Sequence, residues 1–161
     1  MRRTLSCILS IVMILMFAYP INAQAASSHK TGALTGPPPE IIQPFTLFDP
    51  DYSYLERGGS YISELSDERI NIWGDTYGTV HKDEIGVELT LQRWNGSSWV
   101  DVISGSPSVD TDSAYAYQSH ILVSVAKGYY YRTKSSHWII YGDTYEAGTR
   151  YSGSILLPLT K

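Results

Sequence analysis

The fold is decided by the stretch VELTLQRWNGSSWV, residues 87–100. Its first half alternates the apolar residues Val87, Leu89 and Leu91 with polar ones, so one face of a strand is apolar and the other faces water. Asn95-Gly96 then separates this run from a second apolar run, and both of these residues tolerate a positive φ. The stretch therefore predicts a β-hairpin with one buried face.

The same two-residue period recurs outside the hairpin. Apolar or aromatic residues alternate with polar ones near 70–72 and 115–125, and the aromatic and aliphatic segments at 129–132, 138–145 and 155–159 also predict strands. Turn-forming residues separate these runs every ~8–12 residues, and no long window carries a helical apolar stripe. The 13 Tyr and 4 Trp suit pleated surfaces. We predict an all-β fold, a two-sheet antiparallel β-sandwich of the fibronectin-III/Ig-like kind with about 7–8 strands.

The N-terminus has the features of an export signal. Arg2-Arg3 precede an apolar run over residues 5–19, Pro20 follows, and Ala23-Gln24-Ala25 places small residues at the −3 and −1 positions. This order predicts a secretory signal peptide over residues 1–25. The run is shorter than the ~20 residues that a spanning helix needs, which argues against a retained membrane anchor. We expect a secreted, extracellular protein that has no membrane association after cleavage.

Cleavage would change the chemistry of the chain. Removing 25 of 161 residues leaves 136, with 10 basic and 16 acidic side chains and a net charge of −6. It also removes Cys7, the one cysteine, so the mature chain has no disulfide and no thiolate nucleophile. An acidic chain lacks the basic face that nucleic-acid binding needs. We therefore predict no nucleic-acid partner.

Two parts are expected after the signal peptide. Residues 26–50 contain Pro37-Pro38-Pro39, which favours an extended polyproline II conformation, and little apolar periodicity. We interpret residues 26–50 as a linker or disordered arm and residues 51–161 as the β-sandwich domain.

Catalytic and metal-binding motifs are absent from the sequence. The four His follow neither the H-E-x-x-H pattern nor an i, i+2 spacing, and no G-x-S-x-G elbow occurs. The D-x-D pairs at 49–51 and 110–112 leave a loop calcium site open, although no EF-hand pattern is present. We predict a non-enzymatic protein with no catalytic residue, no metal and no cofactor.

The aromatic excess points to binding. Tyr and Trp combine a flat apolar ring with a polar tip, which suits stacking on sugars or packing on a protein. The alternative is cross-strand pairing that only stabilises the sheets. The predicted ligand-binding residues are Trp94, Trp99, Tyr129, Tyr130, Tyr131 and Trp138.

One short segment occurs twice. Residues 72–77 read IWGDTY and residues 140–145 read IYGDTY. We interpret both Gly-Asp pairs as turns or bulges at equivalent strand ends. A duplicated binding loop is the alternative.

Three segments and one histidine resemble a known family. DEIGV at 83–87, LQRWNGSSWV at 91–100, GYYYR at 128–132 and the following His137 resemble small exported proteins of Bacillus-like Gram-positive bacteria, a family of unknown function of the DUF6147 type. The resemblance covers about residues 60–158 and implies a secreted protein without an assigned activity. It transfers no catalytic residue.

A second resemblance concerns the segment that precedes and begins the tyrosine run. Residues 125–132 resemble the turn that enters a late strand of fibronectin-III-like sandwiches, where a Tyr bonds back to the main chain.

These observations predict a secreted, non-enzymatic β-sandwich of uncharacterised role that binds an extracellular protein or envelope partner through surface aromatics. The alternative is a carbohydrate- or cell-wall-binding module, which three or more coplanar exposed rings on one face would favour. An extracellular hydrolase is the third hypothesis, and no residue constellation supports it.

Overall fold

The computed structural model describes residues 30–40, 48–66, 69–122 and 124–159. The predicted signal peptide, 1–25, lies outside the described residues, as do 26–29 and 41–47 of the predicted arm. Within the described ranges, no helix is long and apolar enough to cross a bilayer. The strands there are β1 (Leu55–Ser66), β2 (Arg69–Lys82), β3 (Glu84–Trp94), β4 (Trp99–Ser104), β5 (Ser108–Asp110), β6 (Ser113–Leu122), β7 (Tyr129–Tyr141), β8 (Thr144–Tyr151) and β9 (Ile155–Leu157).

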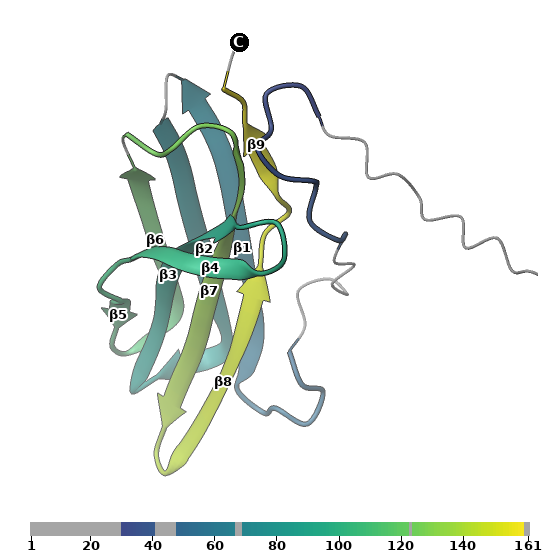
Figure 1. The fold of residues 1–161 in the computed structure, drawn as a ribbon. Coiled ribbons are helices and arrows are strands. Elements are labelled where there is room, and N and C mark those ends of the chain that lie inside the picture. Colours follow the sequence, from purple (N-terminus) through teal and green to yellow (C-terminus); the bar gives the residue numbers. More distant parts are fainter. Residues whose placement is uncertain (1–29, 41–47, 67–68, 123, 160–161) are drawn as a thin grey trace, which may run out of the picture.

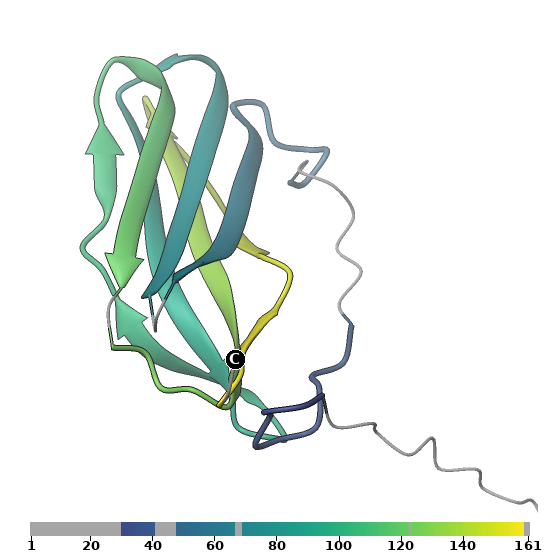
Figure 2. The same cartoon turned by 90° about the horizontal axis from the view of Figure 1, so that it is seen from above.

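The strands form two antiparallel sheets packed face to face (Figures 1 and 2). One sheet has the order β1-β2-β6; the other has the order β4-β3-β7-β8, with β5 paired to β3 and β9 paired to β7. In immunoglobulin lettering these are the A-B-E and C′-C-F-G strands. The predicted β-sandwich is confirmed. The structure has nine strands in its described part, more than predicted; the predicted runs did not include β1 or the three-residue β5.

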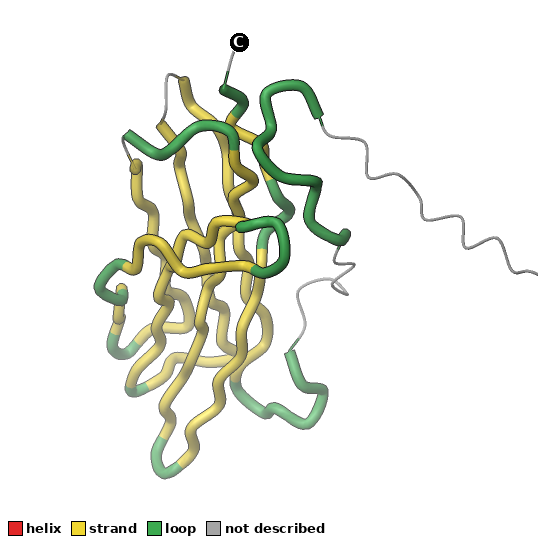
Figure 3. The backbone as a smooth tube through the Cα atoms, viewed as in Figure 1, coloured by secondary structure: helices red, strands yellow, loops and turns green. Residues whose placement is uncertain are grey.

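The core lies between the two sheets. Val87, Leu89 and Leu91 are completely buried, as the alternation predicted, and they face Ile70 and Ile72 of the opposite sheet. Loops lie at the top and bottom of the sandwich and also at mid-height, on either side of β4 (Figures 1 and 3).

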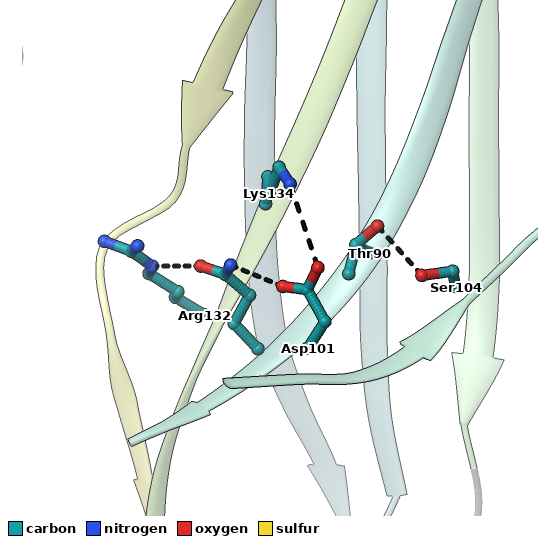
Figure 4. Close-up of polar contacts among 6 residues, drawn as sticks. Thr90, Asp101, Ser104, Arg132 and Lys134 are labelled. Atoms are coloured by element: carbon teal, nitrogen blue, oxygen red, sulfur yellow. Dashed lines mark hydrogen bonds and ion pairs between the residues drawn. The ribbon is translucent and has the colours of Figure 1, made fainter. Parts of the chain in front are cut away.

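The face of β3 that points away from the core is less exposed to solvent than predicted. Thr90 and Gln92 are also buried, although they point away from the core. Their polar atoms are satisfied across the sheet by β4: Thr90 Oγ1 lies 3.2 Å from Ser104 Oγ, and Gln92 Nε2 donates to Asp101 at 2.6 Å (Figure 4). A central strand is flanked on both sides, so neighbouring side chains cover its outer face as well.

The predicted hairpin joins β3 to β4 through residues 95–98, and Trp94 pairs with Trp99. Gly96 has a φ of +103°, as a turn glycine allows. Asn95 has another role from the one predicted: its Oδ1 accepts the backbone N–H groups of Ser97 and Ser98 at 2.9 and 2.8 Å. The side chain thus completes the turn as an Asx cap.

A tyrosine corner marks the entry to β7. Tyr131 is 1% exposed, and its hydroxyl donates to the carbonyl of Ala126 at 2.8 Å. This contact has the form that the resemblance to fibronectin-III-like sandwiches implies.

Part of the predicted arm lies against the sandwich. The Leu34 N–H donates to the Gly128 carbonyl at 2.7 Å, and the Leu159 N–H donates to the Gly32 carbonyl at 2.9 Å. Residues 32–34 therefore follow the end of the sandwich where β7 begins and β9 ends (Figure 1).

One carboxylate connects the edges of the two sheets. Glu146 of β8 is 7% exposed and accepts the backbone N–H groups of Ser53, Tyr54 and Leu55 at 2.8, 2.9 and 2.6 Å. It therefore attaches the start of β1 to a strand of the opposite sheet. In some other proteins a disulfide makes such a connection.

We expect Glu146→Gln to lower the free energy of unfolding by roughly 2–4 kcal/mol, because an amide replaces one of the two acceptor oxygens and the charge is lost. Urea denaturation measures the change. Glu56→Gln is the control, since that side chain is 49% exposed and should be almost neutral. Equal effects of the two substitutions would contradict this role of Glu146.

Candidate functional site

Three of the six predicted ligand-binding residues are buried, and of these Tyr131 belongs to the core. Trp94 is 7%, Tyr130 3% and Tyr131 1% exposed. Trp94 packs on Trp99 with ring centroids 5.5 Å apart, and Tyr131 forms the tyrosine corner. Their surroundings are those of packed aromatic residues.

The other three, Trp99, Tyr129 and Trp138, are partly exposed, and each contacts a different set of residues. Trp138 covers the glycine opposite it, Gly86, and its Nε1 donates to Glu84 at 2.7 Å. Tyr129 lies under the guanidinium of Arg93, 4.6 Å from the ring centroid. Trp99 lines a cavity. The structure therefore does not bring the six residues together on one surface, and their binding role stays a prediction.

A different set of aromatic residues shares one open surface. Along β2, the buried positions Ile72, Gly74 and Thr76 face the core, so the side chains of the residues between them point outward. The strand register adds outward residues from β1 and β6. We call this outer side of the β1-β2-β6 sheet the aromatic face; its rings are Tyr61, Trp73, Tyr77, Tyr115 and Tyr117.

The rings of the aromatic face meet in cross-strand pairs. Tyr61 and Trp73 are opposite each other and stack with centroids 5.3 Å apart and planes 14° apart. Tyr77 and Tyr115 are also opposite each other, with centroids 4.8 Å apart and a tilt of 53°. These contacts give one parallel pair and one tilted pair, so the face does not have the three or more coplanar rings that would favour a carbohydrate-binding module. Tyr117, which is 47% exposed, borders them.

Polar groups lie between these rings. Asp75 sits on β2 between Trp73 and Tyr77 and opposite Tyr117. Burial raises the pKa of the Asp75 carboxyl, while a backbone hydrogen bond from Gly59 and the charge of Arg57 oppose that rise. The Arg57 guanidinium lies 3.8 Å from the Tyr77 ring centroid. Burial also raises the pKa of Tyr61 and Tyr115, so both hydroxyls stay protonated and can donate hydrogen bonds.

Sequence reasoning placed Asp75 wrongly. Gly74-Asp75 lies in the middle of β2, whereas Gly142-Asp143 forms the turn between β7 and β8. The two copies of the Gly-Asp-Thr-Tyr segment therefore do not occupy equivalent strand ends. The signal that could have found the face is the two-residue spacing of Trp73, Asp75 and Tyr77, which matches that of Tyr115 and Tyr117.

Two cavities adjoin the loop of residues 152–154. One, of about 250 Å³, continues from the stacked Tyr61 and Trp73 to this loop and Ile155. The other, of about 310 Å³, lies between the same loop, Trp99, Arg132 and the arm at residues 38–40. A Cβ added at Gly153 would meet no atom within 4 Å, so the loop backbone is open to an approaching ligand.

A polar network crosses the outer side of the second sheet (Figure 4). Arg132 Nε donates to Gln92 Oε1 at 2.7 Å, and Gln92 in turn donates to Asp101. Lys134 Nζ lies 3.8 Å from the other Asp101 oxygen. The network fixes the Arg132 side chain beside the larger cavity.

The core holds a histidine network. His137 is 1% exposed; its Nδ1 lies 2.8 Å from Thr76 Oγ1, and its Nε2 lies 2.8 Å from Ser135 Oγ. Thr76 donates to the Gly86 carbonyl, so its oxygen is left to accept the Nδ1–H. Burial, with a smaller contribution from Arg150, lowers the pKa of His137 to about 3. The ring is therefore neutral and serves as an interior hydrogen-bonding group.

No group of three or more His, Cys, Asp or Glu side chains that could hold a metal ion occurs in the described part of the chain. The chain matches no protein-family model, and neither a curated protein nor a solved structure matches it. The resemblance to the exported family of unknown function stays a prediction.

Acid should destabilise the protein through His137. The unfolded histidine has an ordinary pKa near 6.5, so below that pH the unfolded state binds a proton that the folded state refuses. The contribution is fully present above pH 6.5 and is lost as the pH falls toward 3. We expect a loss of about 3 kcal/mol between pH 7 and pH 4 from this group.

Urea denaturation across this pH range measures the slope. His137→Asn should reduce the slope of the free energy of unfolding against pH by an amount equivalent to nearly one proton. His81→Asn, at an exposed position, should leave that slope unchanged. An unaltered slope in His137→Asn would show that other groups control the acid sensitivity.

Proposed function

We propose that this protein is a secreted, non-enzymatic carbohydrate-binding module of the cell envelope or its surroundings, and that the aromatic face is its binding surface. The observation that carries the proposal is the gathering of five exposed or half-exposed aromatic side chains and a central carboxylate on the outer side of one sheet. Pyranose rings present apolar C–H faces to aromatic rings and hydroxyl groups to polar side chains. The aromatic face offers both kinds of contact.

The polar groups are placed as sugar recognition requires. Asp75 accepts hydrogen bonds between two aromatic pairs, and the Tyr61 and Tyr115 hydroxyls can donate them. Asn71 and Ser119 add a hydrogen-bonded pair on the same face, with Ser119 Oγ donating to Asn71 Oδ1 at 3.0 Å.

The ring geometry favours single glycan chains. Trp73 and Tyr77 are four residues apart on one strand, a distance of ~13 Å, which spans a short oligosaccharide. The 53° tilt between Tyr77 and Tyr115 breaks the plane set by Tyr61 and Trp73. A flat crystalline polysaccharide would need coplanar rings, whereas a twisted single chain can follow a twisted sheet.

The expected ligand class can be tested by affinity electrophoresis against soluble polysaccharides and by sedimentation with purified peptidoglycan. We expect retention by at least one of them, and we expect Trp73→Ala to weaken it roughly 5- to 30-fold, because roughly 1–2 kcal/mol of stacking is lost. Tyr145→Ala is the matched control, since Tyr145 is 65% exposed on β8 and lies outside the aromatic face.

Thermal melting must show that Trp73→Ala remains folded, since the lost cross-strand pair costs only ~0.2–1 kcal/mol. Absence of retention on every glycan, or equal binding by Trp73→Ala and the parent protein, would refute the proposal. Binding of an extracellular protein through the same rings would support the alternative of a protein partner instead.

A further inference from the structure

Arg132 carries a buried and unused hydrogen-bond donor. Its side chain is 7% exposed, yet its Nη1 has no hydrogen-bond partner among the described residues. A buried polar group without a partner is costly, and a charged one more so, and a bound water, ion or ligand is what ordinarily satisfies such an atom. The atom belongs to a residue that lines the 310 Å³ cavity.

Two aromatic rings and one neutral amide hold the Arg132 guanidinium in place. It lies 4.4 Å from the Trp99 ring centroid and 4.1 Å from that of Tyr151. Its Nε is bonded to the neutral amide of Gln92. The nearest acid in this network, Asp101, is engaged by Gln92 and Lys134 (Figure 4). Guanidinium N–H groups bind carboxylates, and in Arg132 the Nη1 group is the one without a hydrogen-bond partner among the described residues, although protein atoms cover it.

The cavity has the size and lining of a small ligand site. Its volume falls at the lower end of the range for ligand pockets, enough for one sugar unit. Trp99 offers an aromatic wall, and Ser152 and Ser154 offer polar groups. The same loop, residues 152–154, borders the cavity that begins at Tyr61 and Trp73. The two sites therefore adjoin along one edge of the sandwich.

We propose that Arg132 binds the carboxylate of an acidic sugar, so that the glycan recognised by this protein is an acidic one; this rests on the proposed function of the aromatic face. The neutral part of the glycan stacks on the aromatic face, and its carboxylate enters the Arg132 cavity past the loop of residues 152–154. Arg132 is thus the residue that selects acidic over neutral glycans.

The arm contributes a competing charge. Glu40 lines the Arg132 cavity together with Pro38 and Pro39. Its carboxylate bears the same charge as the ligand group that we propose, so it should repel that group or compete for the guanidinium. Removing the Glu40 charge should strengthen the binding of acidic ligands and leave the binding of neutral ones unchanged.

The test compares oligogalacturonate, which carries carboxylates, with a neutral galactan oligosaccharide of equal length by isothermal titration calorimetry. The parent protein should prefer the acidic oligosaccharide, with an affinity that falls as salt is added. Arg132→Met should lose roughly 10- to 100-fold in affinity for the acidic ligand only, and Arg132→Lys should recover part of it. Glu40→Gln should bind the acidic ligand more tightly.

Lys127→Met is the control for net charge, because Lys127 is exposed and lines neither cavity. Equal affinity of the parent protein for the two oligosaccharides, unchanged by Arg132→Met, would overturn the assignment of Arg132 while leaving the proposed function intact. A loss of acidic binding in Arg132→Met with no effect of Trp73→Ala would support Arg132 and refute the aromatic face. Binding of neither oligosaccharide, or of acidic peptides alone, would overturn the acidic-glycan assignment.

Melting curves separate binding from folding. If Arg132→Met fails to fold, Glu40→Gln and Arg132→Lys are used for the test, because Glu40→Gln leaves the contacts of Arg132 with Trp99 and Tyr151 in place and Arg132→Lys keeps a cation at this position. Absence of any change in acidic-ligand affinity in these two variants would overturn the proposal.

Discussion

The position of β2 in the middle of its sheet determines what both sides of that sheet do. Ile70 and Ile72 are completely buried against β3, and Thr76 bonds to the carbonyl of Gly86 across the core. Because successive side chains of a strand point to opposite sides, this packing forces Trp73, Asp75 and Tyr77 outward. The neighbours β1 and β6 then supply the remaining rings by register alone. The aromatic face is thus a consequence of core packing.

Buried polar contacts strengthen a sandwich whose described residues contain no cysteine. Glu146 binds three backbone N–H groups at the start of β1, and His137 joins Thr76 to Ser135 between the sheets. Lys82, 1% exposed, places its ammonium 4.7 and 5.0 Å from the ring centroids of Tyr54 and Tyr141. Each contact joins segments far apart in sequence. Such contacts specify how the sheets are aligned, which an apolar core by itself leaves less determined.

The two proposed sites use the two sheets differently. The aromatic face needs only one sheet, since its rings come from adjacent strands in register. The Arg132 cavity needs four separate segments: the hairpin that carries Trp99, strand β7, the loop after β8, and the arm at residues 38–40. In this network Arg132 does not bond directly to Asp101, because the neutral amide of Gln92 accepts from Arg132 and donates to Asp101. Affinity and selectivity would therefore reside in different parts of the molecule.

The sequence by itself determined the all-β class, the two-sheet sandwich, the hairpin at residues 95–98 and the apolar face of β3, because each follows from a local two-residue period or from turn chemistry. It did not determine which aromatic residues would be exposed: Tyr130 and Tyr131 are buried, whereas Tyr61, Trp73 and Tyr117 form the surface proposed to bind. Alternation shows that two sides exist but not which side meets the other sheet. The pairing of Arg132 with Trp99, and with a loop some twenty residues further on, depends on strand order and register, which only the tertiary structure decides.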